Sequence, residues 1–178
     1  MARIAAARRY AEAALQTGRA DGTLDNWERD LAAIGAAFAH PDLARLMQHP
    51  AVAYAEKERV LQRVLGDRVG AQPLRLALLM VRRGRPGGIG AMVARFTELL
   101  RHERGISLAH VRTALPLTDE QRGAVAARLG QLTGEQIEME ETVDPALIGG
   151  ISVRIGDKLY DASVRSRLER LRARLTAV

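Results

Sequence analysis

The spacing of apolar residues changes near residue 105, and this change constrains the fold more than any other feature of the sequence. Before it, apolar residues recur every three or four positions, which predicts helices packed by one face. The second predicted helix shows the pattern in a narrow seam: Leu24, Trp27, Leu31, Ile34 and Phe38. After residue 105, alternating segments such as Ile151, Val153 and Ile155 indicate strands. We therefore predict a mainly α protein, with a six-helix bundle over residues 1–104 and a small α+β domain over residues 105–178.

Helix boundaries in the first part are set by proline and glycine. His40-Pro41 and His49-Pro50 each end a helix, because the residue before proline is pushed out of the helical region. The fifth helix, PLRLALLMVRR from Pro73, is apolar nearly all round, so we expect it in the middle of the bundle. The segment GRPGGIG (84–90) lacks the ending of a phosphate-binding loop, which favours a turn between helices over a nucleotide site.

The second part combines strands with two helices. ISLAHVRTALPL (106–117) predicts an extended segment, and a capping box from Thr118 to Gln121 opens a helix. The apolar face of that helix is predicted as Val125, Leu129 and Leu132. The pair Gly156-Asp157 predicts a hairpin turn. The last helix begins near Ser163, and we expect it to bury four residues: Val164, Leu168, Leu171 and Leu175.

The charge of the chain says less about its function than the apolar pattern says about its fold. The net charge is +6, and only two of the 27 basic residues are lysine. The basic residues are spread among 21 acidic ones, which favours a solvated surface of mixed charge over a nucleic-acid site. Two regions have opposite charge: an acidic segment with Glu135, Glu138, Glu140, Glu141 and Asp144, and a basic last helix with Arg165, Arg167, Arg170, Arg172 and Arg174. These regions either pair or are solvated within the domain, or form a docking surface for a charged helical partner.

No residue set suggests catalysis. The chain has no cysteine, and its four histidines lack metal-ligand spacing. Glu140 and Glu141 are adjacent on a predicted strand, so they point to opposite faces and do not share a site. No apolar run approaches the roughly 20 residues of a membrane helix, and we interpret the Arg-rich N-terminus as a structural helix. We therefore predict no catalytic, cofactor-binding or metal-binding residues, and an interaction protein.

Four sequence motifs, spread along the whole chain, resemble those of a known protein family. They are ARRYAEAAL, LMVRRGRPGGIGAMVARFTELL, LTDEQRGAVAARLGQLTG and, most extensively, VDPALIGGISVRIGDKLYDASVRSRLERL. In this order they resemble the delta subunit family of F-type ATP synthases, called the oligomycin-sensitivity-conferring protein in mitochondria. The chain departs from the family in RPGGIG, where leucines are commoner, and at Ser166, where glycine is common.

The resemblance implies a non-catalytic stator subunit, which links the alpha/beta catalytic head to the b-type peripheral stalk so that the head resists rotor torque. It implies no cofactor, no nucleic acid and only indirect membrane association, at the cytoplasmic face of a bacterial plasma membrane. The bundle over 1–104 would bind N-terminal segments of alpha subunits in a groove between its first and fifth helices. The groove residues would be Tyr10, Ala13, Ala14, Leu78 and Leu79, with Trp27 nearby; core packing is the alternative for each.

The domain over 105–178 would bind the b-type stalk subunits. Its stalk-facing or signature residues would be Gly149, Gly150, Arg154, Gly156, Asp157, Asp161, Val164, Arg165 and Leu168. The two adjacent glycines would serve backbone geometry. Arg154, Asp157, Asp161 and Arg165 would either form an internal polar network or touch the stalk.

Overall fold

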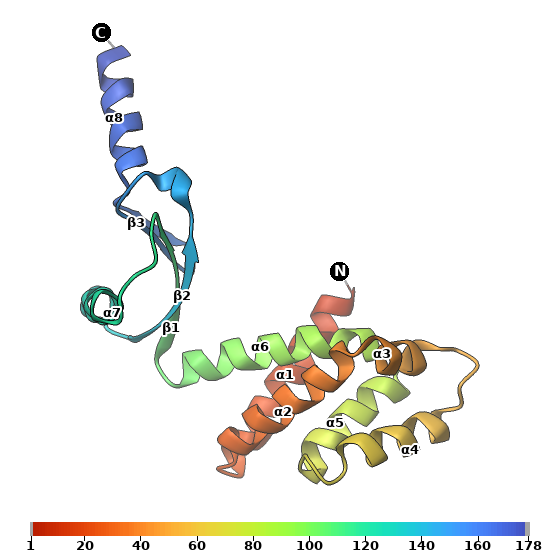
Figure 1. The fold of residues 1–178 in the computed structure, drawn as a ribbon. Coiled ribbons are helices and arrows are strands. Elements are labelled where there is room, and N and C mark those ends of the chain that lie inside the picture. The colour runs from red at the N-terminus through yellow and green to blue at the C-terminus, as the bar shows by residue number, and fades with distance from the viewer. Residues whose placement is uncertain (1, 177–178) are drawn as a thin grey trace. The chain divides into compact units, whose positions relative to one another are not determined.

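The computed structural model describes residues 2–176, which contain eight α-helices and one four-stranded sheet (Figure 1). The chain divides into two compact units, Met1–Leu100 and Arg101–Val178. The predicted mainly helical fold with a small C-terminal α+β part is confirmed.

The first unit consists of helices joined by short turns: α1 (Ala2–Ala20), α2 (Leu24–Ala39), α3 (Pro41–Gln48), α4 (Tyr54–Leu65), α5 (Ala71–Arg82), the 3-10 turn η1 (Pro86–Gly88) and most of α6 (Ile89–Glu103). His40 and His49 end α2 and α3 in extended backbone conformations, as the prolines that follow them predict. The segment around Pro86 forms the predicted turn between α5 and α6.

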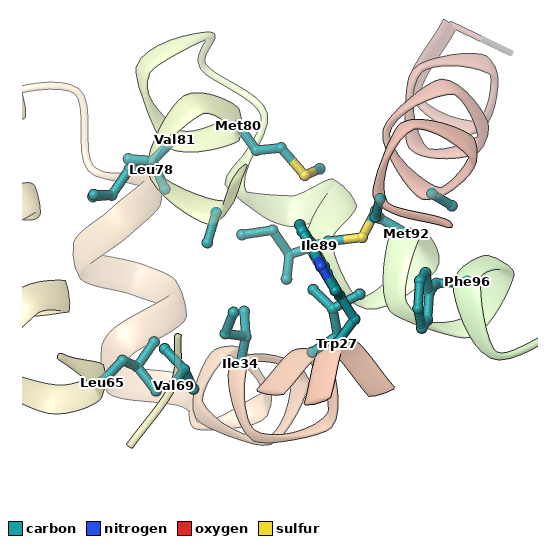
Figure 2. Close-up of a cluster of buried hydrophobic side chains, with 14 of the residues drawn as sticks. Trp27, Ile34, Leu65, Val69, Leu78, Met80, Val81, Ile89, Met92 and Phe96 are labelled. Carbon is teal, nitrogen blue, oxygen red and sulfur yellow. The ribbon is translucent and has the colours of Figure 1, made fainter. Parts of the chain in front are cut away.

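Apolar side chains from α1 to α6 form the core of the first unit. Figure 2 shows Trp27 of α2 and Met92 and Phe96 of α6 in this cluster. Ala7, Ala11 and Ala14 present small buried side chains on α1, so other helices can approach it closely. The expectation for α5 is only partly correct: Ala77, Leu78, Met80 and Val81 are buried, but Leu79 is 41% exposed. Helix α5 packs against α1, α2 and α4, but in a small bundle even such a helix keeps one face in water, and here that face carries leucine.

The second unit is a sheet with strand order β2-β1-β3-β4. Its elements are β1 (Ile106–Thr113), α7 (Asp119–Thr133), β2 (Gln136–Val143), the 3-10 turn η2 (Pro145–Leu147), β3 (Ile151–Ile155), β4 (Lys158–Asp161) and α8 (Val164–Thr176). Helix α7 makes the crossover between the parallel strands β1 and β2, and β3 pairs antiparallel with both β1 and β4. The capping box at Thr118 and Gln121 and the β3–β4 hairpin at Gly156 form as predicted.

Ala109, Val111 and Val153 of the sheet pack against Leu129 of α7 and form the core of the second unit. Leu132, predicted on the same face of α7, is 57% exposed, so the core takes in Leu129 and part of Val125 but not Leu132.

The burial predicted for α8 is wrong. No residue of α8 is buried, and the exposed fractions are 37% for Val164, 52% for Leu168, 54% for Leu171 and 72% for Leu175. Leu129 already closes the core of the unit, while α8 leaves the end of β4 and contacts the turn η2 (Figure 1). The apolar side of α8 therefore has no core to enter within its own unit.

Candidate partner-binding surfaces

Gly149 and Gly150 form a turn that lies against the start of α8. The Val164 N–H donates to the Gly149 carbonyl over 2.9 Å, and the Ala162 N–H donates to the Ile151 carbonyl over 2.9 Å. Gly150 has a φ of +77°, and a Cβ there would lie 2.5 Å from the Ala162 oxygen; a Cβ on Gly149 would lie 3.2 Å from Val164 Cγ2. The turn therefore needs glycine at position 150 for both conformation and space.

Ser163 and Asp161 fix the N-terminus of α8 from the other side. Ser163 is buried, and its Oγ accepts from the Ser166 N–H over 3.1 Å, as an N-cap residue does. The Asp161 Oδ1 in turn accepts from the Ser163 N–H over 2.9 Å. Hydrogen bonds from the Ser163 side chain and backbone hold the pKa of Asp161 below its usual value. Ser163 was predicted only as the approximate start of this helix and not as its cap, although a serine before an apolar periodic segment is the usual signal.

The acidic segment forms its ion pairs inside the second unit. Glu138 of β2 pairs with Arg101 over 2.7 Å, and Glu140 lies 2.8 Å from Nδ1 of His110. Asp144 pairs with Arg112. The hydrogen bond from Arg112 is the main reason that the pKa of Asp144 lies below its usual value, and the charge of Arg165 on α8 adds to it. Of the alternatives left open above, pairing within the unit therefore applies to these acids, while the ion pair of Arg165 on α8 is with Glu169 of the same helix.

Glu141 lies on the opposite side of β2 from Glu140 and joins the strand to α7. Its Oε2 accepts from Arg122 over 2.9 Å, and its Oε1 accepts from the Leu117 N–H over 2.8 Å. The hydrogen bond from Arg122 is the main reason that the pKa of Glu141 lies below its usual value, and the Leu117 N–H adds to it. This carboxylate has a structural role beside the start of α7.

The polar residues of the signature do not meet in one network within the described residues. Arg165 pairs with Glu169 over 3.0 Å, and Asp161 binds Ser163. Asp157 lies in the β3–β4 turn that Gly156 opens with a φ of +56°. Arg154 lies elsewhere on the sheet, in a hollow of about 390 Å³ that is lined by His110, Arg112, Ser152, Arg154 and Leu159.

The residues predicted for the alpha-subunit groove divide between core and surface. Ala14, Trp27 and Leu78 belong to the buried cluster of the first unit. Tyr10 is partly buried, whereas Ala13 and Leu79 are exposed. Helices α1 and α5 are neighbours, and a hollow of about 370 Å³ lies where Ala6 and Ala7 of α1 meet Met80 and Val81 of α5 beside the Gly84–Gly88 turn.

A second hollow, of about 470 Å³, lies between α2 and α4 and was not predicted. Its lining is mainly apolar: Ala33, Ala36, Ala37, Leu43, Val64 and Leu65, with His40 and Arg68 at the polar positions. The alanines of α2 outside the Leu31 and Ile34 face are the sequence signal that could have indicated it, because small side chains leave space between helices.

The part of the chain that the structure describes has neither a metal-binding cluster nor a membrane-spanning helix. The described residues hold no group of three or more His, Asp or Glu side chains placed to bind a metal ion. Between residues 2 and 176, no helix combines the length and the hydrophobicity needed to cross a membrane.

Both units carry exposed apolar side chains on helices, and their polar side chains are engaged in caps and ion pairs. This combination is typical of a subunit that binds other proteins. Comparison with known proteins identifies which one. Residues 6–175 match the family model described as "ATP synthase delta (OSCP) subunit". The chain therefore belongs to the ATP synthase delta (OSCP) family, and the resemblance of its motifs is confirmed. Members of this family are structural subunits of ATP synthase and are not themselves catalytic.

Curated relatives agree along the whole chain. ATP synthase subunit delta of Laribacter hongkongensis is 34% identical over 165 residues, which cover 93% of this chain and 93% of the relative. That of Chlorobium phaeovibrioides is 34% identical over 179 residues, covering 100% and 99%. A chain of the mitochondrial ATP synthase of Toxoplasma gondii has the same fold, with a TM-score of 0.71 at 22% identity over 97% of this chain and 98% of that one.

Proposed function

We propose that the chain is the stator subunit that links the alpha/beta catalytic head of an F-type ATP synthase to its b-type peripheral stalk. One observation carries this proposal: the family match extends over both structural units, from residue 6 to residue 175. A linker needs two separate binding surfaces, and each unit offers exposed apolar side chains on a helix, Leu79 in the first and Leu168 in the second. In this role the subunit holds the head against rotor torque during ATP synthesis.

The head-binding part is proposed to be the six-helix bundle over residues 1–104. An amphipathic N-terminal helix of an alpha subunit would lie along α1 and α5 with its apolar face on the bundle. Leu79 and Ala13 are accessible for such a contact and Tyr10 is partly so, while Ala14, Trp27 and Leu78 support the surface from the core. The hollow at Ala6, Ala7, Met80 and Val81 offers a socket at one end of the same helix pair.

The stalk-binding part is proposed to be the domain over residues 105–178, with the ends of the b-type stalk subunits as its partner. The protein would then be peripheral at the cytoplasmic face of a bacterial plasma membrane, held there by the complex. Nucleic acid is not a proposed partner.

Binding of a labelled peptide tests the head-binding surface. The peptide is the N-terminal segment of the alpha subunit from the same organism, and its fluorescence anisotropy is measured against the full chain and two variants. Leu79→Asp places a charge on α5; Val64→Asp makes the same kind of change on α4, where the side chain is similarly exposed, 39% against 41%. Losing the burial of one leucine costs about 1.5 kcal/mol or more, so we expect Leu79→Asp to weaken binding about tenfold or more and Val64→Asp to have little effect.

Two results would contradict this placement. If Val64→Asp weakens binding and Leu79→Asp does not, the alpha-subunit helix lies in the hollow between α2 and α4. If the wild-type chain binds duplex DNA with a steep salt dependence and does not bind the peptide, the basic surface is functional and the stator proposal fails.

A further inference from the structure

Helix α8 carries an apolar stripe with the spacing of a coiled coil. Val164, Leu168, Leu171 and Leu175 are separated by four, three and four residues, which places them at successive d, a, d and a positions of a heptad repeat. All four are at least 37% exposed. Two turns or more of one helix face are therefore apolar and uncovered in the isolated chain, as for a helix that pairs with another helix.

The residues on both sides of this stripe are all arginine. In the register fixed by the stripe, Arg165 and Arg172 take the e positions, and Arg167 and Arg174 take the g positions. Side chains at e and g flank the seam of a coiled coil and determine which partner is accepted. The single acid of α8, Glu169, lies at a b position away from the seam and pairs with Arg165 over 3.0 Å.

This charge pattern selects one kind of occupant. A second copy of α8 would place arginine opposite arginine along the seam, which is unfavourable. The acidic segment of the same unit has its own ion-pair partners, Arg101, His110, Arg112 and Arg122. Asp144 also acts through its charge on Arg165, at the end of α8 that lies on η2. What fits α8 is a helix from another protein with apolar a and d positions and acidic e and g positions.

We infer that α8 forms a two-helix coiled coil with an acidic amphipathic helix of the stalk subunits. This inference rests on the proposed stator function and specifies its stalk contact. The start of the seam is fixed on the sheet, because the Val164 N–H binds Gly149 and Ser163 caps α8. Over its 13 residues, α8 spans roughly 20 Å, which is about two heptads.

Two designed peptides test the seam directly. Each has about four heptads with leucine at a and d; one carries Glu and the other Lys at every e and g position. Titration of the full chain, monitored by the anisotropy of a dye on the peptide, should show binding of the Glu peptide and binding of the Lys peptide at least about tenfold weaker. The variant Arg167→Glu/Arg174→Glu should reverse this preference. It leaves the Arg165–Glu169 pair intact.

A charge-matched control separates the seam from general attraction. Arg128→Glu/Arg170→Glu changes the net charge equally but alters an exposed residue of α7 and a c position of α8. It should keep the preference for the Glu peptide. If both double variants lose the preference equally, or if the wild type does not distinguish the two peptides, α8 is not a coiled-coil partner of defined charge and the inference is overturned.

The same variants are then tested against the purified soluble domain of the organism's b-type subunit. A loss of at least about tenfold in affinity for Arg167→Glu/Arg174→Glu alone supports the inference. Unchanged binding overturns it and leaves the stator function standing, because the stalk then contacts another surface. If the wild type binds neither this domain nor the alpha-subunit peptide, the proposed function itself fails.

Discussion

Replacing Gly150 with alanine tests how the signature turn holds the start of α8. The φ of Gly150 is +77°, and an added Cβ would lie 2.5 Å from the Ala162 oxygen. The conformation alone costs an alanine about 1 kcal/mol or somewhat more. Relieving the overlap requires a shift of the backbone, at about 1–3 kcal/mol. We therefore expect Gly150→Ala to destabilise the second unit by about 2–4 kcal/mol.

Gly134→Ala isolates the conformational part of this cost. Gly134 ends α7 in the same left-handed region, with a φ of +76°, but nothing lies within 4 Å of an added Cβ. This control should cost only about 1 kcal/mol. The difference between the two variants then measures the close approach of the turn to Ala162.

Urea unfolding followed by far-UV circular dichroism measures both variants. With a slope of about 1–3 kcal/mol per M, the midpoint should fall by about 0.7 to 4 M for Gly150→Ala, and by about a half to a quarter of that for Gly134→Ala. Trp27, the only tryptophan, is buried in the first unit, so its fluorescence should change less than the dichroism. Equal losses for the two variants would refute the steric argument, and with it the role assigned to Gly150 in seating α8.

Three further predictions concern single residues. The pKa of Glu141 is lower in the folded protein because of Arg122, so this carboxylate stabilises the fold above its unfolded-state pKa, near 4.5, and the stabilisation disappears as the pH falls through the folded-state pKa. Glu141→Gln should therefore flatten the decline of the melting temperature below about pH 4.5, and an unchanged acid slope would contradict this. A Cβ on Gly18 would lie 2.9 Å from Cδ1 of buried Trp27, so Gly18→Ala should destabilise the chain by about 1–2 kcal/mol and change the Trp27 emission. Gly90→Ala in α6, where an added Cβ meets nothing, should stabilise by up to about 1 kcal/mol.

The local elements were predictable because their signals lie within a few residues of one another. Pro41 both ends α2 and begins α3, and Thr118 with Gln121 caps α7 through contacts three residues apart. Alternation identified β2 and β3 for the same reason. The strand order could not be predicted in this way. The parallel pairing of β1 with β2 depends on α7 crossing back over the sheet, and no short sequence pattern encodes that pairing.

Contacts between distant residues account for most of what the sequence did not predict. The carboxylate of Asp30 is buried in α2 and accepts the Gly70 N–H over 2.8 Å, 40 residues away. The hollow between α2 and α4 depends on the placement of Ala33 and Val64 on helices that are far apart in sequence. Likewise, apolar periodicity marked Leu78 and Leu79 alike, but only the packing of α5 buries one and exposes the other.

The incorrect prediction that α8 is buried shows what apolar periodicity indicates and what it does not. A stripe such as Leu168, Leu171 and Leu175 indicates that a helix has an apolar partner, because four exposed large side chains on one face are unfavourable in water. It does not indicate whether the partner belongs to the same chain. The residues that flank the stripe indicate which kind of partner it has. A stripe that packs on the core of its own chain needs only a mixed polar edge, whereas four arginines at the e and g positions require acids opposite them. The acids Glu138, Glu140, Glu141 and Asp144 of this unit already form ion pairs with other residues, and this favours a partner of α8 from another chain.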